Sequence, residues 1–261
     1  MNQSKTFLFG LLLFAGSILL TCNKKEPLNL VWSDEFDVKG QPDSLKWTYD
    51  LGDGCPNICG WGNNEAQFYT KNNSNIRVQN GSLIIDAIKN GDRWTSARIK
   101  SQSRANFTYG RIEFRAKLPE GQGTWPALWM LGENVSTKGW PAGGEIDVME
   151  HFGKNPGVVQ SAMHTPSSFG DTVDKGATTV STYHSDFHVY ATNWTKDKIE
   201  FFVDDVSFYI YQPALKNAET WPYDNPFFII MNIAMGGNAG GPIDPSLAHV
   251  SMEVDYVRVY Q

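Results

Sequence analysis

The sequence predicts an all-β fold, a sandwich of two antiparallel sheets. Short runs of alternating apolar and polar residues recur along the chain, and such alternation is typical of strands with one buried face. Turn signals such as Asn-Gly and Pro-Glu-Gly separate these runs. No long stretch has the periodicity of an amphipathic helix, apart from a short turn expected near residues 213–219. Together these features favour an antiparallel β-sandwich.

Seven runs are expected to form the main strands. They span residues 82–89, 110–118, 144–150, 187–194, 199–211, 227–234 and 250–260. Turns are expected at Asn80-Gly81, Asn90-Gly91, Pro119-Glu120-Gly121 and Asp204-Asp205. Two segments rich in glycine and asparagine, 52–64 and 236–241, are expected to be surface loops above a cleft.

The N-terminal segment predicts export. Lys5 precedes an apolar run over residues 7–20, which is the pattern of a secretory signal peptide covering residues 1–21. The run is too short to predict a membrane span.

The end of this segment, Leu19-Leu20-Thr21-Cys22, resembles the lipobox of bacterial lipoproteins, in which the cysteine becomes the lipidated first residue. Cys22 would then begin a short tether over residues 22–29, and residues 30–261 would form one domain. We expect an exported protein that is lipid-anchored to the outer membrane, with display on the cell surface left open. The alternative is an ordinary signal peptide cleaved elsewhere, with Cys22 incidental.

The composition argues against nucleic acid as a partner. Removing 21 of the 261 residues leaves 240, enough for one large β domain. The loss of Lys5 moves the net charge from −6 to about −7, and a negative chain repels polyanions. Aromatic residues reach 13% with nine tryptophans, which suits stacking on sugar rings, although tryptophan also fills ordinary cores. We expect a monomer that contacts a membrane only through its lipid anchor.

Two cysteines remain once Cys22 is assigned to lipid. An exported compartment permits disulfides, so we expect a bridge between Cys55 and Cys59 that closes the short loop around Pro56. No spacing of cysteine and histidine resembles a zinc site.

The hexapeptide from Glu145 to Glu150 carries three carboxylates on one short apolar stretch. In a regular strand Glu145 and Asp147 share a face, whereas Glu150 lies on the opposite face. A β-bulge at Val148 or Met149 would return Glu150 to the face of the other two, and bulges are common beside active sites. We therefore predict one acidic row with an inserted residue.

This row suits the hydrolysis of a glycosidic bond. Four effective steps of about 3.3 Å put the outer Cα atoms roughly 13 Å apart, and inward-leaning glutamates could bring their carboxyl groups to about 5–5.5 Å. That separation is used by retaining glycosidases, whereas inverting enzymes need a wider gap. The alternatives are a solvent-facing polar edge and a metal site, although the Asp/Asn/Gly pattern of a calcium loop is missing. Neighbouring glycines and aromatics favour a cleft wall, namely Gly143-Gly144, His151-Phe152-Gly153, Trp125, Trp129 and Trp140.

Several motifs in this order resemble glycoside hydrolase family 16, specifically its laminarinase-like, endo-1,3(4)-β-glucanase branch. The resemblance runs from about Leu30 to Gln261. Besides the acidic hexapeptide, it rests on residues 32–36 (WSDEF), 60–65 (GWGNNE), 95–99 (TSARI), 125–131 (WPALWML) and 254–260 (VDYVRVY). It implies a β-jelly roll with a concave substrate groove, and a β-glucan as the substrate.

The resemblance also implies roles for the three acids. Glu145 is expected to be the nucleophile that forms a covalent glycosyl-enzyme, and Glu150 the general acid and then base. Asp147, between them, is expected to share a proton or hydrogen bond with them, because adjacent carboxylates split their apparent pKa values. To act as an acid, Glu150 must carry a proton near neutral pH.

Other residues are expected to contact the sugar chain. Trp125 and Trp129 share a strand face and match aromatic platforms of the family, although a core role stays open for one of them. His164 lies in a strand resembling the neighbour of the catalytic strand, so we favour contact with substrate or the acids over a structural role. Hydroxyl binding is a weaker prediction for three polar residues that could instead satisfy the backbone, namely Asn63, Arg98 and Asn232.

Two further features follow from the resemblance. Many relatives bind a structural Ca²⁺ away from catalysis, and the matching oxygen donors are Glu35, the carbonyl of Gly81 and Asp255. No cofactor is expected for catalysis itself.

Ala239 stands where relatives often carry tryptophan, which leaves room for mixed-linkage as well as pure β-1,3-glucan. The leading hypothesis is an endo-β-glucanase; a non-catalytic β-glucan-binding jelly roll and a transglycosylase on the same site are the alternatives.

Overall fold

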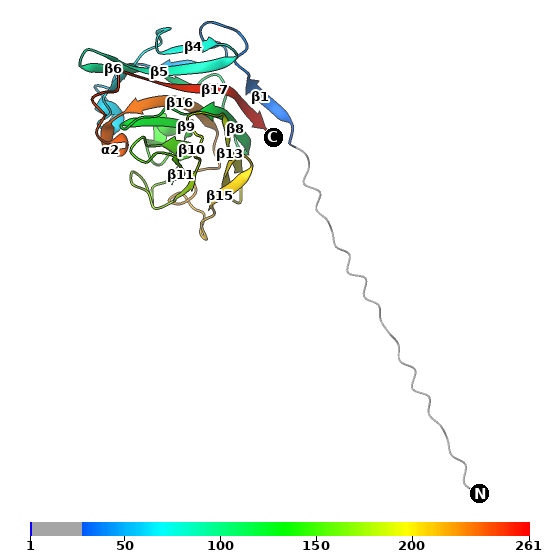
Figure 1. Ribbon diagram of the computed structural model, residues 1–261. Helices are drawn as coiled ribbons and strands as arrows, with labels where there is room; N and C mark the ends of the chain where they lie inside the picture. Colours follow the sequence, from blue (N-terminus) through cyan, green and yellow to red (C-terminus); the bar gives the residue numbers. More distant parts are fainter. Residues whose placement is uncertain (2–27) are drawn as a thin grey trace.

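Two β-sheets stack face to face in the computed structural model, which describes Met1 and residues 28–261 (Figure 1). The predicted lipidation residue Cys22 lies outside the described residues, as do nearly all of the predicted signal peptide and most of the tether. No helix in the described part is long and apolar enough to cross a membrane.

The smaller sheet has seven antiparallel strands and carries the acidic hexapeptide on an interior strand. In spatial order its strands are β12 (Lys175–Thr179), β11 (Val158–His164), β10 (Glu145–His151), β9 (Thr124–Gly132), β16 (Phe227–Met235), β7 (Arg98–Lys100) and β2 (Thr48–Asp50).

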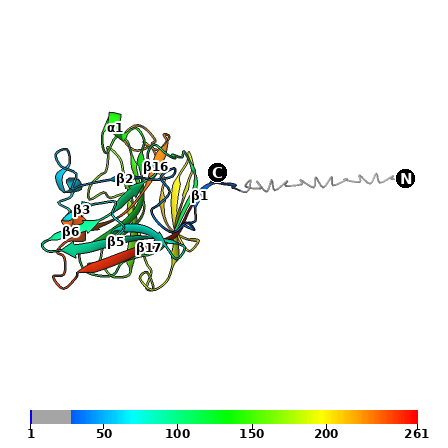
Figure 2. The same ribbon diagram turned by 90° about the horizontal axis from the view of Figure 1, so that it is seen from above.

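The larger sheet has ten strands and backs the smaller one. Its main path runs through β15 (Val206–Tyr211), β14 (Ile199–Val203), β13 (His188–Trp194), β8 (Gly110–Lys117), β17 (His249–Tyr260), β5 (Ser82–Asn90), β6 (Arg93–Ser96) and β3 (Gln67–Tyr69), while β1 (Leu30–Asp34) pairs with β17 and β4 (Ile76–Gln79) with β5. Only the short β3–β6 pair among these is parallel. The long strands β5 and β17 lie side by side across this sheet (Figure 2).

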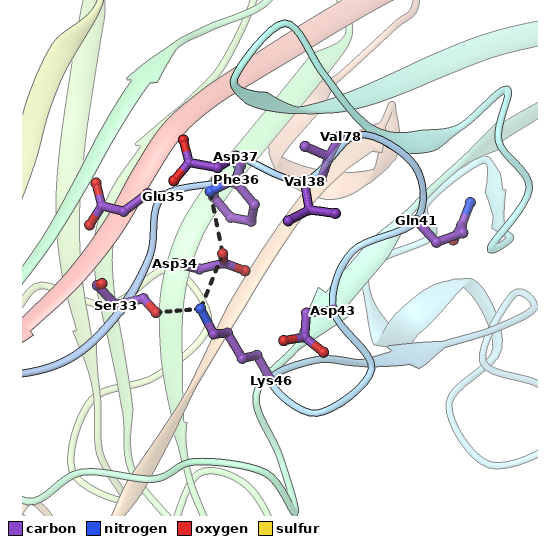
Figure 3. Close-up of a pocket in the computed structure, with 10 residues that line it drawn as sticks. All are labelled: Ser33, Asp34, Glu35, Phe36, Asp37, Val38, Gln41, Asp43, Lys46 and Val78. Atoms are coloured by element: carbon purple, nitrogen blue, oxygen red, sulfur yellow. Dashed lines mark hydrogen bonds and ion pairs between the residues drawn. The ribbon is translucent and has the colours of Figure 1, made fainter.

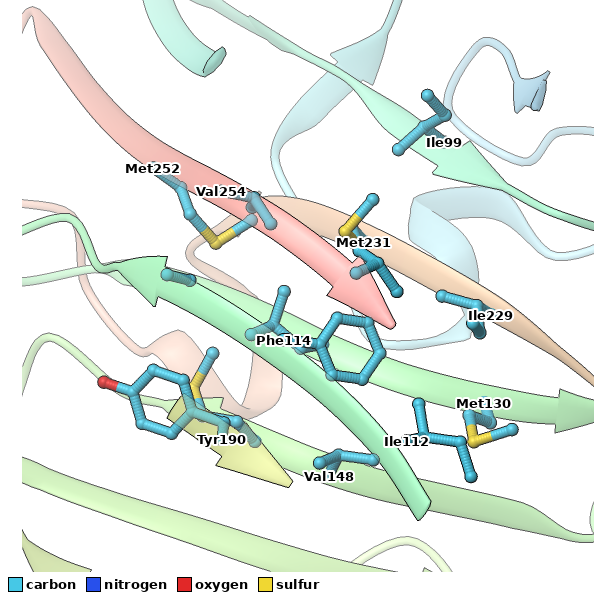
Figure 4. Close-up of a cluster of buried hydrophobic side chains, with 14 of the residues drawn as sticks. Ile99, Ile112, Phe114, Met130, Val148, Tyr190, Ile229, Met231, Met252 and Val254 are labelled. Atoms are coloured by element: carbon cyan, nitrogen blue, oxygen red, sulfur yellow. The ribbon is translucent and has the colours of Figure 1, made fainter. Parts of the chain in front are cut away.

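Side chains from both sheets meet in one hydrophobic core. Figure 4 shows Ile112 and Phe114 of β8 facing Met130 of β9, Val148 of β10 and Ile229 of β16. Each of these side chains is at most 1% exposed. Since alternate residues of a strand point to opposite faces, filling the core fixes which side chains of the smaller sheet reach its outer face.

The predicted all-β sandwich is confirmed, and every predicted run contains a strand. The run 199–211 splits into β14 and β15 at Asp204 and Asp205, which both have positive φ as a tight turn requires. The other strands include short ones such as β2, β3 and β7, with three residues each. Three residues are too few for an alternating pattern to stand out. Residues 213–219 form turns and no helix.

The two predicted glycine-rich loops meet each other. Each contains one short helical turn, η1 (Cys59–Gly62) and α2 (Gly237–Gly240), and a third, α1 (Val135–Lys138), precedes β10. The Asn238 amide donates to the Asn63 carbonyl at 2.8 Å, and Asn64 Nδ2 donates to Asn238 Oδ1 at 2.9 Å. A disulfide joins Cys55 and Cys59 within the first loop.

Candidate active site

Strand β10, which lies between β9 and β11, contains one inserted residue, as the acidic row requires. Against β11, Asp147 pairs with Ala162 but Glu150 pairs with Gln160. Three steps on β10 therefore match two on its neighbour, and the register with β9 shifts at the same place. The predicted bulge is confirmed.

The core explains how the bulge works. Val148 and Met149 are consecutive, yet both belong to the buried core and are 1% exposed. Two adjacent apolar side chains on one face reverse the parity of the strand. Glu150 thereby returns to the outer face, where Glu145 and Asp147 also lie.

Each outer glutamate accepts a hydrogen bond from a different tryptophan. Trp140 Nε1 donates to Glu145 Oε2 at 3.0 Å, and Trp125 Nε1 donates to Glu150 Oε1 at 2.9 Å. Gln160 Nε2, directly across from Glu150 on β11, donates to its other oxygen at 3.0 Å. These neutral donors fix the orientation of both carboxyl groups without cancelling their charge.

His164 lies between the other two acids. Its Nε2 atom is 3.0 Å from Asp147 Oδ2 and 3.5 Å from Glu145 Oε1. Asp147 and His164 Nε2 form a close ion pair when the imidazole is protonated. The other ring nitrogen, Nδ1, is buried without a hydrogen-bond partner among the described residues. The prediction that His164 contacts the acids agrees with this geometry.

Burial and nearby charges raise the pKa values of Glu145, Asp147 and His164. Burial raises the pKa of Asp147 well above its ordinary value, and the charges of Glu145 and Glu150 add to the effect. Burial also raises the pKa of Glu145, although the His164 charge opposes this. For His164, burial works against the charged form, but contact with Asp147 and the nearby glutamates outweigh it and raise the pKa to about 9. The acids and the histidine thus titrate as one set.

The other predicted sugar contacts form a network on the same outer face. Trp129 Nε1 donates to Asn232 Oδ1 at 2.8 Å, and Asn232 Nδ2 donates to the Tyr69 hydroxyl at 3.1 Å. The Arg98 guanidinium lies between the rings of Trp61 and Trp129, at 4.8 and 4.7 Å. Since both amide atoms of Asn232 are used within the protein, its hydrogen bonds support the indole of Trp129. Direct hydroxyl binding by Asn232 and Arg98 stays a prediction.

Asn63 faces inward toward its own loop. Its Nδ2 atom donates to Glu65 Oε1 at 3.2 Å, and Gln67 Nε2 donates to Glu65 Oε2 at 2.6 Å. Burial raises the pKa of Glu65. The sugar-binding role of Asn63 therefore also stays a prediction.

The sequence analysis misses Gln160 and the hydrogen bond made by Trp140. Gln160 becomes visible only through its register opposite Glu150. Trp140 is included in the expected cleft wall, but its hydrogen bond to Glu145 depends on a loop that no periodic pattern describes. Trp140 is 46% exposed and meets Phe169, 52% exposed, edge to face at 5.5 Å. The pair leaves an aromatic surface open to solvent beside Glu145.

The expected calcium ligands are paired with arginines. Glu35 accepts two hydrogen bonds from Arg258, at 3.0 and 2.8 Å, and Asp255 accepts one from Arg115 at 2.6 Å. Gly81 lies in the turn between β4 and β5. Calcium binding here stays a prediction that requires both pairs to open, so the residues as they lie do not fit the ion.

Beside Glu35 lies a pocket of about 400 Å³ (Figure 3). Lys46 Nζ crosses it to donate to the Ser33 carbonyl at 2.8 Å and to contact Asp34 at 3.3 Å. Asp34 also accepts a hydrogen bond from Trp47 at 2.6 Å. These contacts connect β1 to the following loop.

Comparison with known proteins agrees with this geometry. The sequence pattern described as Glycosyl hydrolases family 16 matches residues 61–258, which include the whole acidic row. The chain belongs to this family.

Three relatives match this family 16 hydrolase over most of both chains. A β-glucanase of Rhodothermus marinus is 44% identical over the whole chain and 95% of its own length. The crystal structure of a laminarinase from Flavobacterium sp. UMI-01 is 47% identical, with a TM-score of 0.86, and covers 89% of this chain and 100% of its own. A laminarinase structure from Rhodothermus marinus is 45% identical, with a TM-score of 0.84, and covers 90% of this chain and 98% of its own. The jelly-roll sandwich of the family is therefore the fold of this glycoside hydrolase.

Proposed function

We propose that this hydrolase cleaves β-1,3-glucan, or mixed-linkage β-1,3/1,4-glucan, within the chain and with retention of configuration. The observation that carries the proposal is the bulge at Val148, which brings Glu145 and Glu150 to one face of β10. Relatives named laminarinase and β-glucanase support the choice of substrate.

In the first step Glu145 attacks the anomeric carbon and Glu150 protonates the departing glycosidic oxygen. Trp140 holds Oε2 of Glu145, which leaves Oε1 as the attacking atom. Trp125 and Gln160 together hold both oxygens of Glu150 and orient it toward the leaving group. The products are a covalent glycosyl-enzyme and a released sugar hydroxyl.

In the second step water replaces the leaving sugar. Glu150 takes a proton from this water, whose oxygen attacks the anomeric carbon and releases Glu145. Asp147 and His164 lie next to the departing carboxylate, where the imidazolium stabilises its returning charge. Two inversions at one carbon give overall retention.

One digestion experiment tests the substrate and the stereochemistry together. Laminarin, lichenan, agarose and carrageenan are each incubated with the enzyme, and the products are sized and followed by proton NMR. We expect short oligosaccharides from laminarin or lichenan, with the β-anomer formed first. The α-anomer first, or cleavage of agarose or carrageenan alone, would contradict the proposal.

The same experiment separates the two alternatives. A non-catalytic glucan-binding protein releases no product, and it would not need three mutually repelling acids. A transglycosylase produces oligosaccharides longer than its acceptor, because a sugar hydroxyl replaces water in the second step. Ala239, in α2, offers no indole for a sugar ring, which supports testing the mixed-linkage glucan beside laminarin.

We also propose that Cys22 anchors the enzyme to the outer membrane, where cleavage would release oligosaccharides close to the cell. The support is the sequence Leu19-Leu20-Thr21-Cys22 alone. Replacing Cys22 with Ser and fractionating the cells tests this proposal, with fatty-acid labelling of the native chain as a second readout. Unchanged membrane association of the variant, with no label on the native chain, would refute it.

A further inference from the structure

A chain of hydrogen bonds connects the acidic row to Glu65. Trp129 pairs with Asp147 across strands β9 and β10, and its Nε1 atom donates to Asn232 Oδ1 at 2.8 Å. Asn232 Nδ2 donates to the Tyr69 hydroxyl at 3.1 Å, and this hydroxyl donates to Glu65 Oε2 at 3.5 Å, the longest link. Tyr69 and Asn232 are 0% and 6% exposed, so solvent competes little for these groups.

The direction of this chain is fixed by the chemistry of its first donor. An indole N–H can only donate, so Asn232 presents its amide oxygen to Trp129 and its amide nitrogen to Tyr69. The Tyr69 hydroxyl therefore accepts from Asn232, and its own hydrogen is left for Glu65. The chain needs an acceptor at its end.

A second branch reaches the same carboxyl group from the two glycine-rich loops. The Met235 amide, just before loop 236–241, donates to Gln67 Oε1 at 2.8 Å, so Gln67 turns its Nε2 atom to Glu65 Oε2, at 2.6 Å. Asn63 Nδ2 donates to Glu65 Oε1 at 3.2 Å, and the Asn63 carbonyl accepts from the Asn238 amide. Every side chain that hydrogen-bonds the Glu65 carboxyl group is thus a donor.

Only an ionised carboxylate accepts at both oxygens without a proton that needs its own acceptor. Burial raises the pKa of Glu65, whereas the hydrogen bonds from its neighbours and the Arg98 charge lower it. The donors therefore favour the ionised form that the chain requires.

We propose that Glu65 is a positioning residue for glycan binding. As the shared acceptor of both branches, it fixes the Trp129 indole beside the acidic row and joins loops 52–64 and 236–241 to the same network. It acts through Trp129, whose contact with sugar rests on the proposed function, whereas the hydrogen-bond chain itself does not.

Two variants test the chain at different points. Glu65→Met nearly keeps length but removes both acceptor oxygens, and Tyr69→Phe removes a single hydroxyl while Glu65 keeps Asn63 and Gln67. Each should raise KM on laminarin by about three- to tenfold, with kcat within about threefold of the native value. Because both break one chain, the double variant should raise KM no further than Glu65→Met alone.

The position of Trp129 is measured without substrate. In spectra of the ¹⁵N-labelled full chain, the Trp129 indole N–H signal is assigned by its loss in Trp129→Phe. This signal should move in both Glu65→Met and Tyr69→Phe, because Asn232 loses the partner that orients it. Should Glu65→Met fail to fold, Tyr69→Phe alone decides.

The matched control is Asp34→Leu. Asp34 is 8% exposed and also accepts a hydrogen bond from an indole, that of Trp47, but it ends β1 in the other sheet. Its replacement removes both acceptor oxygens, so it should lower the thermal midpoint of unfolding. It should leave the Trp129 signal and KM unchanged.

An unmoved Trp129 signal in Tyr69→Phe, or additive effects on KM in the double variant, would overturn the chain. A moved signal with native KM in Tyr69→Phe would overturn the role of Glu65 in glycan binding. Failure of the native chain to cleave laminarin would instead count against the proposed function, and the signal would still decide whether Glu65 positions Trp129.

Discussion

On the outer face of the smaller sheet, two carboxylates have contrasting electrostatic surroundings. Glu145 on β10 marks what we call the acidic end of this face, and Asp50 on β2 marks the balanced end. On β10, Glu145 accepts a hydrogen bond from a neutral indole and shares a single histidine with Asp147. On β2, Asp50 is paired with two cations, Arg98 at 3.0 Å and Lys100 at 2.5 Å. Both carboxylates have side chains that are 16% exposed. Burial is thus the same, and the balance of charge separates the reactive acid from the structural one.

The strongest test of this comparison removes the charge at each end in turn. Glu145→Gln nearly keeps shape but removes the nucleophile, so kcat on laminarin should fall by at least about a thousandfold, while oligosaccharide binding persists. Asp50→Asn is the matched change at the balanced end, and its kcat should stay within about tenfold of the native value. Reducing-sugar release and isothermal titration measure the two effects. Hydrolysis at the native rate by Glu145→Gln would show that Glu145 is not the nucleophile.

Glu150 should show a different dependence on the substrate. Glu150→Ala should lower the rate on laminarin by about 10²- to 10⁴-fold, because a sugar leaving group needs its proton. Aryl glycosides with an acidic phenol need little protonation, so their first step should be largely spared. Burst kinetics of phenol release measure this step. Equal losses on both substrates would count against an acid/base role.

The third test changes the register of β10. Inserting an alanine after Met149 should turn Glu150 toward the core and abolish activity, since a one-residue slip reverses every face. Deleting Met149 restores simple alternation, so Glu150 stays on the outer face. That variant should fold with measurable activity, after losing about 2–5 kcal/mol of core packing. Activity and circular dichroism check both variants, and an active insertion variant would show that Glu150 does not depend on the register.

The features of β10 show which parts of the site can be predicted from the sequence and which cannot. Alternation and the spacing of Glu145 and Glu150 are local, so they suffice to predict the sheet sandwich and a bulge at Val148 or Met149. Gln160 and the Arg98 network depend on which strands become neighbours, and that information is not local. Asp50 illustrates the difference, because nothing in three residues of β2 indicates that two cations of β7 lie opposite.

At the balanced end we expect a smaller, structural effect. Arg98→Met leaves Asp50 with Lys100 alone and removes the cation from between Trp61 and Trp129. The loss of these contacts should reduce the free energy of unfolding by about 1–3 kcal/mol, and KM should rise more than kcat falls. Urea denaturation and steady-state kinetics measure the two effects. A fall in kcat equal to that of Glu145→Gln would erase the distinction between the two ends.

The smallest expected effect lies in how stability depends on pH. The pKa of His164 is raised from 6.5 to about 9, so the folded chain keeps a proton that the unfolded chain releases. This contribution is fully present below about pH 6.5 and is lost as the pH rises through 9. The raised pKa values of Asp147 and Glu145 also contribute to the stability of the folded chain at low pH. This contribution begins to be lost at a lower pH than that of His164. Only the difference between the native chain and a His164 variant therefore isolates the histidine.

We expect the free energy of unfolding of the native chain to decline between pH 6.5 and 9 by on the order of 1 kcal/mol more than that of His164→Gln. Urea denaturation at each pH measures the decline, and NMR titration of the imidazole ring provides an independent readout. A ring that titrates at or below pH 6.5 would show that burial prevails over the carboxylates. The acidic end of the face would then lack the cation that moderates its charge, and the contrast with Asp50 would be sharper still.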